Sequence, residues 1–390
     1  RIADVDIFIT VYGEPIETIR ETAIAARDVF GLHKTYILDD GKSNEVEQMA
    51  KEIGVEYIRR RGRNVGAKAG NINHALQITS GHYFVIFDAD FVAKHNFLYE
   101  TLPFFEDKNV AFVQTPQVYR ELNNIISRGA GYMQRLFYLL IQPGKNRFNA
   151  AFCVGTNVIF RRSAIDSIGG VYQKSKSEDI WTSILLHEHG FRSVYIPDVL
   201  AIGNTPDTIK TYCKQQLRWA TGGFQILFKH NPITKHLTID QKLQYLSTSA
   251  YYLYGVAIML LLLLPSLHVF FNWSPVNLDI TFGAWASYYL AFYGMQIILA
   301  FYTMEGFKVE SLLLGLVSFP IYVKALFNAI FNREEAWSAT GSRNAIDSPF
   351  NYIVPQVMVF LFLGFTSAVG IWKAYYYETS SLSLIWCLIN

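Results

Sequence analysis

Two aspartates in the stretch FDAD have the chemistry of a site for a divalent cation. Asp88 and Asp90 stand one residue apart at the end of an apolar run that is typical of a β-strand. At a bent strand end both carboxylates can approach one hard cation, directly or through water, because such cations prefer oxygen ligands. A diphosphate would complete the coordination shell, so this pair predicts a site for a cation and a phosphate-bearing ligand.

Polar residues also follow the neighbouring apolar runs. Tyr12 and Glu14 come after the first run, and Asp39 and Asp40 come after the second. A single acid pair is often only a turn or a helix-capping device, but two pairs on neighbouring strands favour a shared site. A glycine-rich loop then places Lys68 at the start of a predicted helix, which suits the approach of a phosphate group.

The elements that must position these residues alternate along the first half of the chain. Strands are predicted at 5–11, 35–40, 55–58, 83–90 and 110–116, and helices at 16–29, 44–53, 68–79 and 96–105. This β-α-β rhythm predicts a doubly wound, mostly parallel sheet, hence an α/β fold. Ligands of such sheets bind beyond the carboxyl ends of the strands, where the polar residues lie.

Composition indicates a membrane protein. The 390 residues are 51% hydrophobic, 15% aromatic and only 17% charged, which is too apolar for a soluble enzyme of this size. The formal net charge is +2, so there is no broad positive field and we expect no nucleic-acid partner. Cys153, Cys213 and Cys387 match neither a zinc site nor a disulfide framework, which fits a reduced, cytosol-facing catalytic part.

The charged residues thin out near residue 240, after which only thirteen of the Asp, Glu, Lys and Arg residues occur. Charge-free stretches at 243–278, 280–304 and 348–372 each reach the ~20 residues that cross a bilayer, and predict three spans. The tail SLSLIWCLIN is typical of a fourth, partial span. Segment 311–332, interrupted by Pro320 and Lys324, is predicted to be an interfacial helix along the membrane, with a short or re-entrant span as the alternative.

Loop charges predict the orientation of these spans. Lysine and arginine are frequent before the first span and between the second and third, whereas the connection NWSPVNLD contains neither. Positively charged loops stay in the cytoplasm. The sequence therefore predicts a cytosolic catalytic part on a multi-pass protein of the plasma (inner) membrane.

Taken together, these residues give the sequence a resemblance to the processive family 2 glycosyltransferases of the cellulose synthase type. The motifs are DDG at 39–41, AKAGNIN at 67–73, DAD at 88–90, SED at 177–179 and Gln215-x-x-Arg218-Trp219, in that family's order. Each tripeptide alone is common, but the ordered set followed by membrane spans is specific. The resemblance implies a GT-A fold, a UDP-sugar donor bound with Mg²⁺ or Mn²⁺, inversion at the anomeric carbon, and passage of the growing polysaccharide into a membrane channel.

The resemblance also implies roles for single residues. Tyr12, Glu14, Asp39 and Lys68 match positions that hold the uridine diphosphate end of the donor. Asp88 and Asp90 match the family's metal-binding DxD motif, with Asp90 as the direct ligand. The segment FCVGTN at 152–157 matches the part of the family that lies beside the acceptor sugar, although cellulose synthases differ after the cysteine.

The reaction requires a base, because an acceptor hydroxyl of high pKa must lose its proton as it attacks the anomeric carbon. Asp179 is the candidate, in the first turn of a helix predicted at 178–189 with Ser177 as N-cap and Gly190 as the C-terminal stop. An acid in this turn is by itself often only a helix-capping residue. Its match to the family's catalytic aspartate favours the catalytic interpretation.

The motif near residue 215 can complete the site. Arg218 can present a planar, permanently charged fork to the pyrophosphate and stabilise the departing UDP. Trp219 offers a flat face for the terminal sugar of the acceptor, and Gln215 can hydrogen-bond donor or acceptor. An amphipathic interface helix with an aromatic anchor is the simpler interpretation, and it is compatible with this role.

The predicted organisation has three parts. Residues 1–206 form a cytosolic GT-A domain, 207–242 form interfacial helices with the QxxRW motif, and 243–390 form a transmembrane channel domain. The last part contains the interfacial helix at 311–332 and, at 333–347, a gating loop that closes over the donor.

In this loop Thr340 would bind a phosphate oxygen, and Arg343 would replace a lysine of the family's pattern. An ordinary solvated connection is the alternative. The replacement weakens the case for cellulose itself and leaves mixed-linkage glucan and mannan-like polymers open.

We therefore expect a processive inverting β-glycosyltransferase with UDP-glucose as the favoured donor. Its partners would be the UDP-sugar, the growing polysaccharide and the lipid bilayer, together with accessory subunits for export. The alternatives are a non-processive membrane glycosyltransferase with a lipid acceptor and a transporter with a nucleotide-sugar-sensing domain. The predicted spans contain almost no charge that could couple transport to an ion, which disfavours the transporter.

Overall fold

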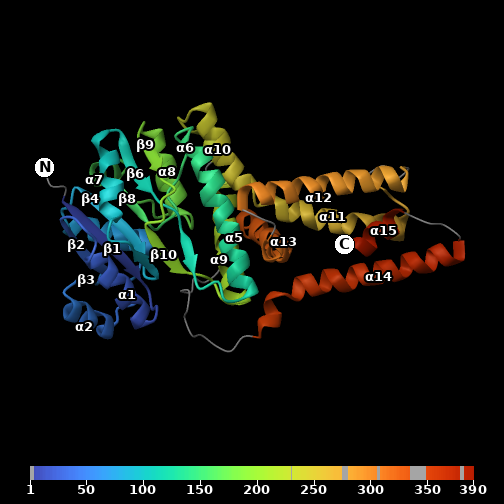
Figure 1. Ribbon diagram of the computed structural model, residues 1–390, viewed down its shortest axis with the longest axis horizontal. Helices are drawn as coiled ribbons and strands as arrows, with labels where there is room; N and C mark the ends of the chain where they lie inside the picture. The colour runs from blue at the N-terminus through green and yellow to red at the C-terminus, as the bar shows by residue number, and fades with distance from the viewer. Residues whose placement is uncertain (1–3, 230, 275–279, 305–307, 334–347, 378–381) are drawn as a thin grey trace.

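The structure, a computed structural model, describes residues 4–229, 231–274, 280–304, 308–333, 348–377 and 382–390. An α/β part with a central sheet forms one end of the molecule, and long helices extend from it at the other (Figure 1). Helices that contact both parts lie between them.

The central sheet has seven strands in the order β3-β2-β1-β4-β8-β6-β9. Neighbouring strands run parallel except at β8, which pairs antiparallel with both β4 and β6. The predicted α/β class with a doubly wound, mostly parallel sheet is thus confirmed. The strands are β1 (Val5–Val11), β2 (His33–Asp39), β3 (Glu56–Ile58), β4 (Tyr83–Asp88), β6 (Val110–Gln114), β8 (Val158–Arg161) and β9 (Arg192–Tyr195).

Helices cover both faces of this sheet, which explains why every residue of β1 is buried. Because side chains alternate along a strand, Ile7 and Ile9 pack on one face with α1 (Ile16–Arg27) and α2 (Asn44–Ile53). Phe8 packs on the other face, in a core that includes side chains of α3 (Ala67–Ile78), α7 (Arg162–Ser167) and α8 (Glu178–Glu188).

A second, three-stranded sheet extends the domain beside the strand ends. Its order is β5-β10-β7, from β5 (Phe91–Ala93), β10 (Ala201–Asn204) and β7 (Val118–Arg120). The predicted strand at 83–90 is therefore β4, a two-residue turn at Ala89 and Asp90, and then β5. This turn brings Asp90 out of the main sheet.

The helical segment after β7 contains a π-helical turn. It consists of α5 (Ile125–Leu136), the π turn Phe137–Ile141 and α6 (Gln142–Asn146). The hydroxyl of Tyr195 donates to the carbonyl of Tyr138 at 2.7 Å, inside this turn. Such turns often occur at functional sites, and this one lines the cavity described below.

Three further helices form the junction between the two parts of the molecule, namely α9 (Ile209–Lys229), α10 (Ile239–Ala250) and α13 (Val309–Ile330). Tyr212 and Phe224 of α9 share a buried core with Leu314 and Tyr322 of α13. The charge-free run 243–278 is thus divided: it begins inside α10, which packs on α9, and continues as a separate long helix.

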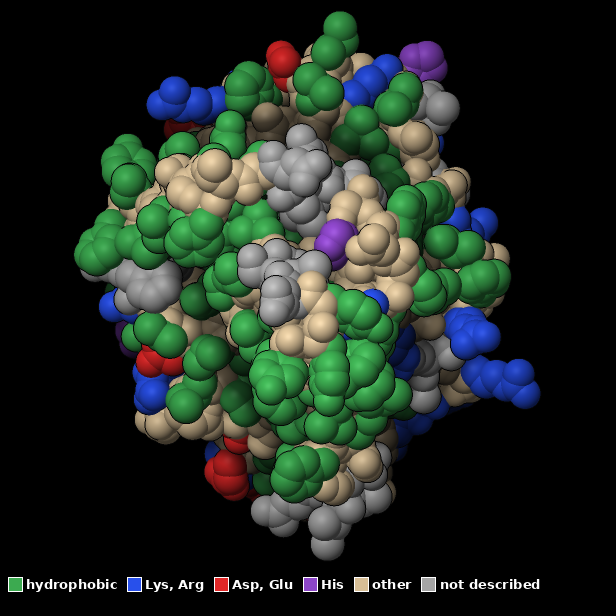
Figure 2. Space-filling model, turned by 90° about the vertical axis from the view of Figure 1, so that its right-hand side faces the viewer, with side chains coloured by type: hydrophobic (Ala, Val, Ile, Leu, Met, Phe, Trp, Pro, Cys, Tyr) green, Lys and Arg blue, Asp and Glu red, His purple; other side chains and the backbone are tan. Residues whose placement is uncertain are grey.

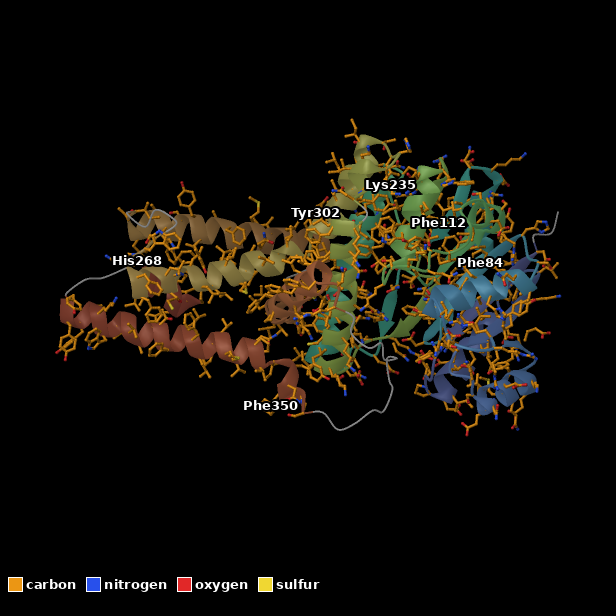
Figure 3. All side chains as sticks on the ribbon, turned by 180° about the vertical axis from the view of Figure 1, so that it is seen from behind. Phe84, Phe112, Lys235, His268, Tyr302 and Phe350 are labelled. Carbon is orange, nitrogen blue, oxygen red and sulfur yellow. The ribbon has the colours of Figure 1, made fainter. Side chains whose placement is uncertain are left out.

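The long helices are α11 (Leu253–Phe271), α12 (Phe282–Met304) and α14 (Val354–Tyr377), and a short α15 (Leu382–Ile389) packs on α11 and α14. His268 lies at their far end, whereas Tyr302 and Phe350 lie at the end next to the α/β part (Figure 3). The long helices therefore alternate in direction, as successive membrane spans do. α11 contains Pro265 and continues as one helix.

By length and composition, four helices could cross a membrane: Leu253–Phe271, Phe282–Tyr302, Val309–Ile330 and Val354–Tyr377. They differ in burial, since 44% of the apolar window of α13 is buried, against 6% for α12. α13 packs against α5, α9 and α11, so it is part of the junction. Its orientation along the membrane stays a prediction.

The surface of the long helices is apolar. Viewed from their far end, hydrophobic side chains gather on the helices and lysine and arginine lie around the margin (Figure 2). Phe360 and Ile298, for example, are 75% and 69% exposed. So large an exposed apolar area is stable in lipid rather than in water, and the chain has the surface of a membrane protein.

Candidate active site

A cavity of about 1660 Å³ lies between the α/β part and the junction helices. Its lining comes from the ends of β1 and β4, the start of α3, the π turn and α6, the loop before β8, and helices α8, α9, α10 and α13. The predicted site residues that line it are Tyr12, Glu14, Lys68, Asp88, Asp90, Asp179, Gln215, Arg218 and Trp219. The structure thus brings together residues that are more than 200 positions apart in the sequence.

The sheet explains why the first of these residues meet. β1 and β4 are parallel neighbours with Thr10 opposite Asp88, and the hydroxyl of Thr10 donates to the Asp88 carboxylate at 3.1 Å. β8 runs antiparallel to β4, so the segment that precedes it reaches the same edge of the sheet. Its Thr156 hydroxyl accepts the backbone N–H of Asp88 at 2.9 Å.

Lys68 is one of the basic residues that line the cavity. Its ammonium pairs with the carboxylate of Asp88 and donates to the carbonyl of Gly155 at 2.7 Å. Burial lowers the pKa of Lys68, but Asp88, Glu178 and Asp179 outweigh this effect, so the net shift is upward. A lysine that stays charged beside the DxD motif is suited to bind phosphate.

Three carboxylates of the cavity wall, Glu14, Asp88 and Asp90, repel one another. Burial, followed by repulsion from Asp88 and Glu14, raises the pKa of Asp90 to about 7. Burial also raises the pKa of Glu14, whose carboxylate accepts the backbone N–H of Tyr12 at 2.6 Å. This excess of buried negative charge fits a bound divalent cation with oxygen ligands. In the described residues no three metal-ligating side chains converge, so Asp88 and Asp90 would leave coordination positions for water and phosphate.

The candidate base stands at the start of α8. One oxygen of Asp179 accepts the N–H of Ile180 at 2.8 Å, and the other lies 3.4 Å from the position that a Cβ on Gly155 would occupy. Burial, and then the neighbouring Glu178, raise the pKa of Asp179 to about 7. This is the range in which a carboxylate acts efficiently as a general base. Ser177 occupies the predicted N-cap position, but its side chain makes no capping hydrogen bond.

The QxxRW residues share one face of α9 because they are spaced by three and four positions. Gln215 donates to the hydroxyl of Tyr119 at 3.4 Å, Arg218 is exposed on the cavity wall, and Trp219 is half-buried there. Gln216 has a different partner and accepts the hydroxyl of Tyr322 on α13 at 3.0 Å. This bond ties α9 to the junction.

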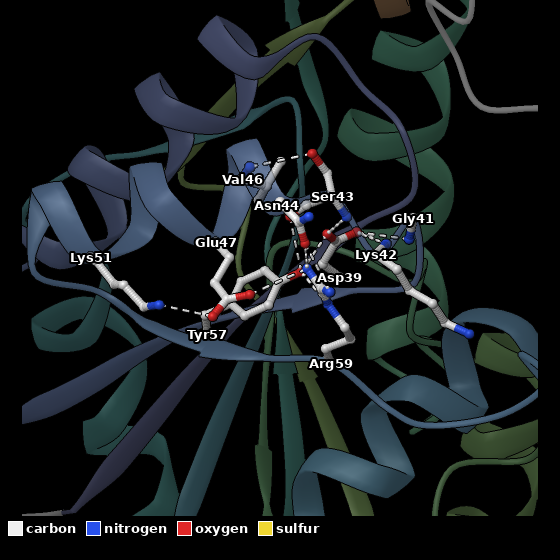
Figure 4. A network of polar contacts seen from close by, with 10 residues as sticks. All are labelled: Asp39, Gly41, Lys42, Ser43, Asn44, Val46, Glu47, Lys51, Tyr57 and Arg59. Carbon is white, nitrogen blue, oxygen red and sulfur yellow. Dashed lines mark hydrogen bonds and ion pairs between the residues drawn. The ribbon is translucent and has the colours of Figure 1, made fainter.

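Asp39 belongs to a network of polar contacts after β2 (Figure 4). Its carboxylate accepts the backbone N–H groups of Gly41, Lys42 and Ser43 at 2.7, 3.0 and 2.8 Å, and the hydroxyl of Tyr57 at 2.7 Å. It is 1% exposed and is not one of the described residues that line the cavity, whereas its neighbour Asp40 is. Asp39 therefore holds the turn after β2, and its contact with uridine stays a prediction.

The loop before Lys68 is held by a buried ion pair. Arg60 donates to both oxygens of Asp40 at 2.6 Å, and also to the carbonyls of Val65 at 2.6 Å and Ala67 at 3.0 Å. Both side chains are less than 10% exposed. The pair fixes the start of α3 and thereby the position of Lys68.

We expect Arg60→Ala to lower the free energy of unfolding by about 3–5 kcal/mol, because it leaves the buried Asp40 carboxylate without its partner. Thermal unfolding of the purified protein in detergent would measure the loss. Arg61→Ala removes a neighbouring but exposed arginine and is expected to be nearly neutral. Equal stability of the two variants would contradict the structural role of the pair.

Gly222 of α9 lies against Ser177 at the start of the base helix. A Cβ at position 222 would overlap the Ser177 hydroxyl and lie 3.0 Å from its Cβ. The next residue, Gly223, meets the ring of Tyr252 in the same way. Gly222 thus allows α9 to approach the start of α8, and Gly223 allows it to approach Tyr252.

We expect Gly222→Ala to reduce turnover by up to about 10²-fold, because a shift of one ångström between reacting groups has effects of this size. The measurement is kcat, with protein folding checked by thermal unfolding. Ser177→Gly in the same chain removes the overlapping atoms and should restore turnover. Gly315→Ala is the control, since a Cβ there meets nothing within 4 Å. Failure of the second substitution to rescue would exclude this contact as the cause.

Thr340 and Arg343 lie outside the described residues, as does nearly all of the predicted gating loop. The gating role of 333–347 stays a prediction.

Sequence reasoning missed several residues of the site. Glu178 lies next to Asp179 and raises its pKa, and its signal was the first acid of the SED motif. Tyr119 bonds Gln215 and lines the cavity, but a single tyrosine in a short strand carries no motif. The Gly155 carbonyl that binds Lys68 comes from the segment assigned to the acceptor side.

Comparison with solved structures supports the fold. The chain is similar to a mannosyltransferase from Pyrobaculum calidifontis, solved in complex with GDP-Man and Mn²⁺, with a TM-score of 0.54 and 16% sequence identity. The similarity covers 86% of this chain and 89% of the other. It confirms the predicted GT-A fold.

Comparison of sequences identifies the family. The chain is 34% identical over 262 residues to a cellulose synthase catalytic subunit [UDP-forming] of Xanthomonas axonopodis pv. citri (strain 306), and 33% over 281 residues to that of Pseudomonas fluorescens (strain SBW25). These matches cover 65% and 69% of this chain but 36% and 38% of the relatives, so the chain spans well under half of their length. The family described as Glycosyl transferase family group 2 matches residues 83–389. The predicted resemblance is confirmed, and the chain belongs to this glycosyltransferase family.

Proposed function

We propose that the protein is a processive, inverting β-glycosyltransferase that polymerises UDP-glucose into a β-glucan and moves the product across the membrane. One observation carries this proposal: a single cavity contains the acid pair with Lys68, the half-buried Asp179, and Arg218 with Trp219 on α9, which packs against the membrane-length helix α13. The cellulose synthase subunits among the relatives support the β-glucan product.

The donor diphosphate would lie between Lys68 and Arg218, whose positive charges stabilise the negative charge that grows on the leaving group. Asp88 and Asp90 would hold Mg²⁺ or Mn²⁺, which neutralises the diphosphate when bound. The Mn²⁺ in the solved mannosyltransferase supports a divalent cation. Tyr12 and Glu14 line the same end of the cavity and would contact the nucleoside.

Asp179 would take the proton of the acceptor hydroxyl as its oxygen bonds to the anomeric carbon and the bond from that carbon to the phosphate oxygen breaks. The acceptor's terminal sugar would rest on Trp219, and Gln215 would hydrogen-bond it. Ile141, Lys145 and Ser247 on α10 also line the cavity, whose volume is about 1660 Å³. Such a volume provides space for an acceptor longer than one sugar and supports a processive reaction.

The arrangement of the long helices supports the cytosolic position of the catalytic part. α11 ends, and α12 begins, at the end of the helices away from the α/β part (Figure 3). In the sequence, the segment NWSPVNLD between these two helices contains neither lysine nor arginine. By the positive-inside rule the far end is extracytoplasmic and the α/β part is cytosolic, in the plasma (inner) membrane.

The test is incubation of the protein in vesicles with single radiolabelled nucleotide sugars, UDP-glucose and GDP-mannose among them, followed by size and linkage analysis. We expect a long β-linked glucan from UDP-glucose. Transfer of one sugar to lipid would establish the non-processive alternative, and a polymer from GDP-mannose would establish a mannan-like product. UDP release without incorporation of sugar would favour the transporter.

A further inference from the structure

A second pocket, of about 510 Å³, lies beside α3, outside the catalytic cavity. One side is a single face of α3, because Gly70, Asn73, His74 and Gln77 follow the i, i+3, i+4, i+7 spacing of a helix. The other side is the arginine-rich segment 59–63, and Gln173 also lines the pocket. Its size is that of a small-molecule site.

The pocket is built on buried, fixed groups. Arg60 is 8% exposed and is held by Asp40 and by the carbonyls of Val65 and Ala67. Gly70 permits this contact, since a Cβ there would overlap the Val65 carbonyl and lie 2.7 Å from the Arg60 guanidinium. The segment that carries the arginines is therefore fastened to α3 at a defined distance.

The charge of the pocket is strongly positive. Four arginines and a histidine line it, and its lining includes no carboxylate among the residues that the structure describes. Arg60 is neutralised by Asp40, and Arg59 lies 3.3 Å from Glu47. Arg61 and Arg63 are exposed and make no ion pair within the described ranges. Two guanidinium groups with uncompensated charge thus face one small pocket.

We propose that this pocket binds a small molecule with a diphosphate group, with Arg61 and Arg63 as its ligands. Guanidinium groups bind phosphate oxygens in a planar, two-pronged geometry, and two of them match the charge of a diphosphate. The site is separate from the donor site, but the two are linked: Arg60 holds the carbonyl of Ala67, the residue before Lys68. An anion bound at Arg61 and Arg63 would fix the segment that leads to the phosphate-binding lysine.

The experiment is calorimetric titration of the full chain in detergent with inorganic pyrophosphate and, separately, with UDP, both with Mg²⁺ present so that the donor site can bind as well. The variants are Arg61→Ala, Arg63→Ala and the pair together. Arg147→Ala is the matched control, because Arg147 is exposed and lines neither cavity. All four variants change exposed residues, so unfolding temperatures should stay unchanged.

We expect the titrations of the wild-type protein to show two classes of binding site, the donor site and the arginine pocket. The paired variant should weaken one class by at least about tenfold, the size expected for lost charge-assisted hydrogen bonds, and leave the other class unchanged. If pyrophosphate fills the affected class and UDP does not, the ligand is an inorganic diphosphate; if UDP fills it, the ligand is a nucleotide.

Three results would overturn the site: one class of site only in the wild-type protein, both classes intact in the paired variant, or an equal loss in Arg147→Ala. The last would show a general effect of net charge. None of these results depends on whether the protein makes a polymer, so the site and the proposed function fail independently.

Discussion

Asp179→Asn is expected to reduce sugar transfer by about 10²–10⁴-fold, or more, and to leave UDP binding intact. The amide keeps the shape of the side chain and its contact with the N–H of Ile180, but it cannot accept the proton of an acceptor hydroxyl. In the proposed site, UDP would be bound by other groups, chiefly Lys68 and Arg218. Two quantities are measured for the variant and the wild type: the initial rate of sugar transfer and the dissociation constant of UDP. Near-normal transfer would remove Asp179 from the role of base.

Glu178→Gln is the matched control, because it neutralises the carboxylate next to Asp179. We expect it to retain far more activity than Asp179→Asn. Only the deprotonated base is active, so wild-type transfer should rise with pH through about 7, the raised pKa of Asp179. Since Glu178 contributes to that raised pKa, the rise in Glu178→Gln should move to lower pH. A profile that does not move would contradict the coupling of the two carboxylates.

Asp179→Asn should also stabilise the fold. A carboxyl whose pKa is raised from ~3.9 in the unfolded chain to about 7 in the fold destabilises the folded state once the pH exceeds the unfolded value. The penalty is complete above pH 7, and a neutral asparagine avoids it. Asp179→Asn should therefore unfold at a higher temperature than the wild type at pH 8 and show little difference at pH 4. A variant that has lost transfer but unfolds at a higher temperature has lost the base and kept its structure.

Asp90→Ala, or removal of divalent cations by a chelator, is expected to abolish transfer. Asp88 and Glu14 already repel the negative charge of Asp90, and a diphosphate would add negative charge that a bound cation neutralises. Adding Mg²⁺ or Mn²⁺ back should restore the chelated wild-type protein and should not restore the variant. Titration with Mn²⁺ would also show weaker binding to Asp90→Ala.

The control for this prediction is Asp166→Ala, because Asp166 is an exposed carboxylate far from the cavity lining. It should keep both activity and Mn²⁺ binding. Full transfer by the wild-type protein in excess chelator would refute the dependence on a cation.

Most of the α/β part could be predicted because its signals are local. β1 and the four central residues of β4 are continuous, buried and mostly apolar, and α2 follows a serine N-cap that accepts the N–H of Val46. The predicted helix at 96–105 is different, since it divides into α4 (Phe97–Thr101) and a 3₁₀ helix, Leu102–Glu106. Pro103 lies in the first turn of that 3₁₀ helix. Proline is tolerated there because a backbone N–H in the first turn has no partner within the helix, so its absence loses no hydrogen bond.

The remaining features depend on tertiary contacts. β8 has only four residues, too few to show a period, and its antiparallel direction follows from pairing with strands far away in the sequence. Likewise, the sequence shows that Asp39 is an acid at a strand end but not that Tyr57 and three backbone N–H groups occupy its oxygens. Arg60 carried no motif, and only its buried pairing with Asp40 reveals its importance.

The position of β8 also affects how the chain can fold during synthesis. β1 to β4 can pair as soon as they leave the ribosome, but β6 has no place beside them until β8, Val158–Arg161, arrives to lie between it and β4. Until then β4 and β6 present unpaired edges, which are prone to aggregation. A nascent chain that stalls before residue 158 would hold a four-stranded partial sheet and an unpaired β6, because β9 also follows later, and the four residues of β8 join β6 to the sheet.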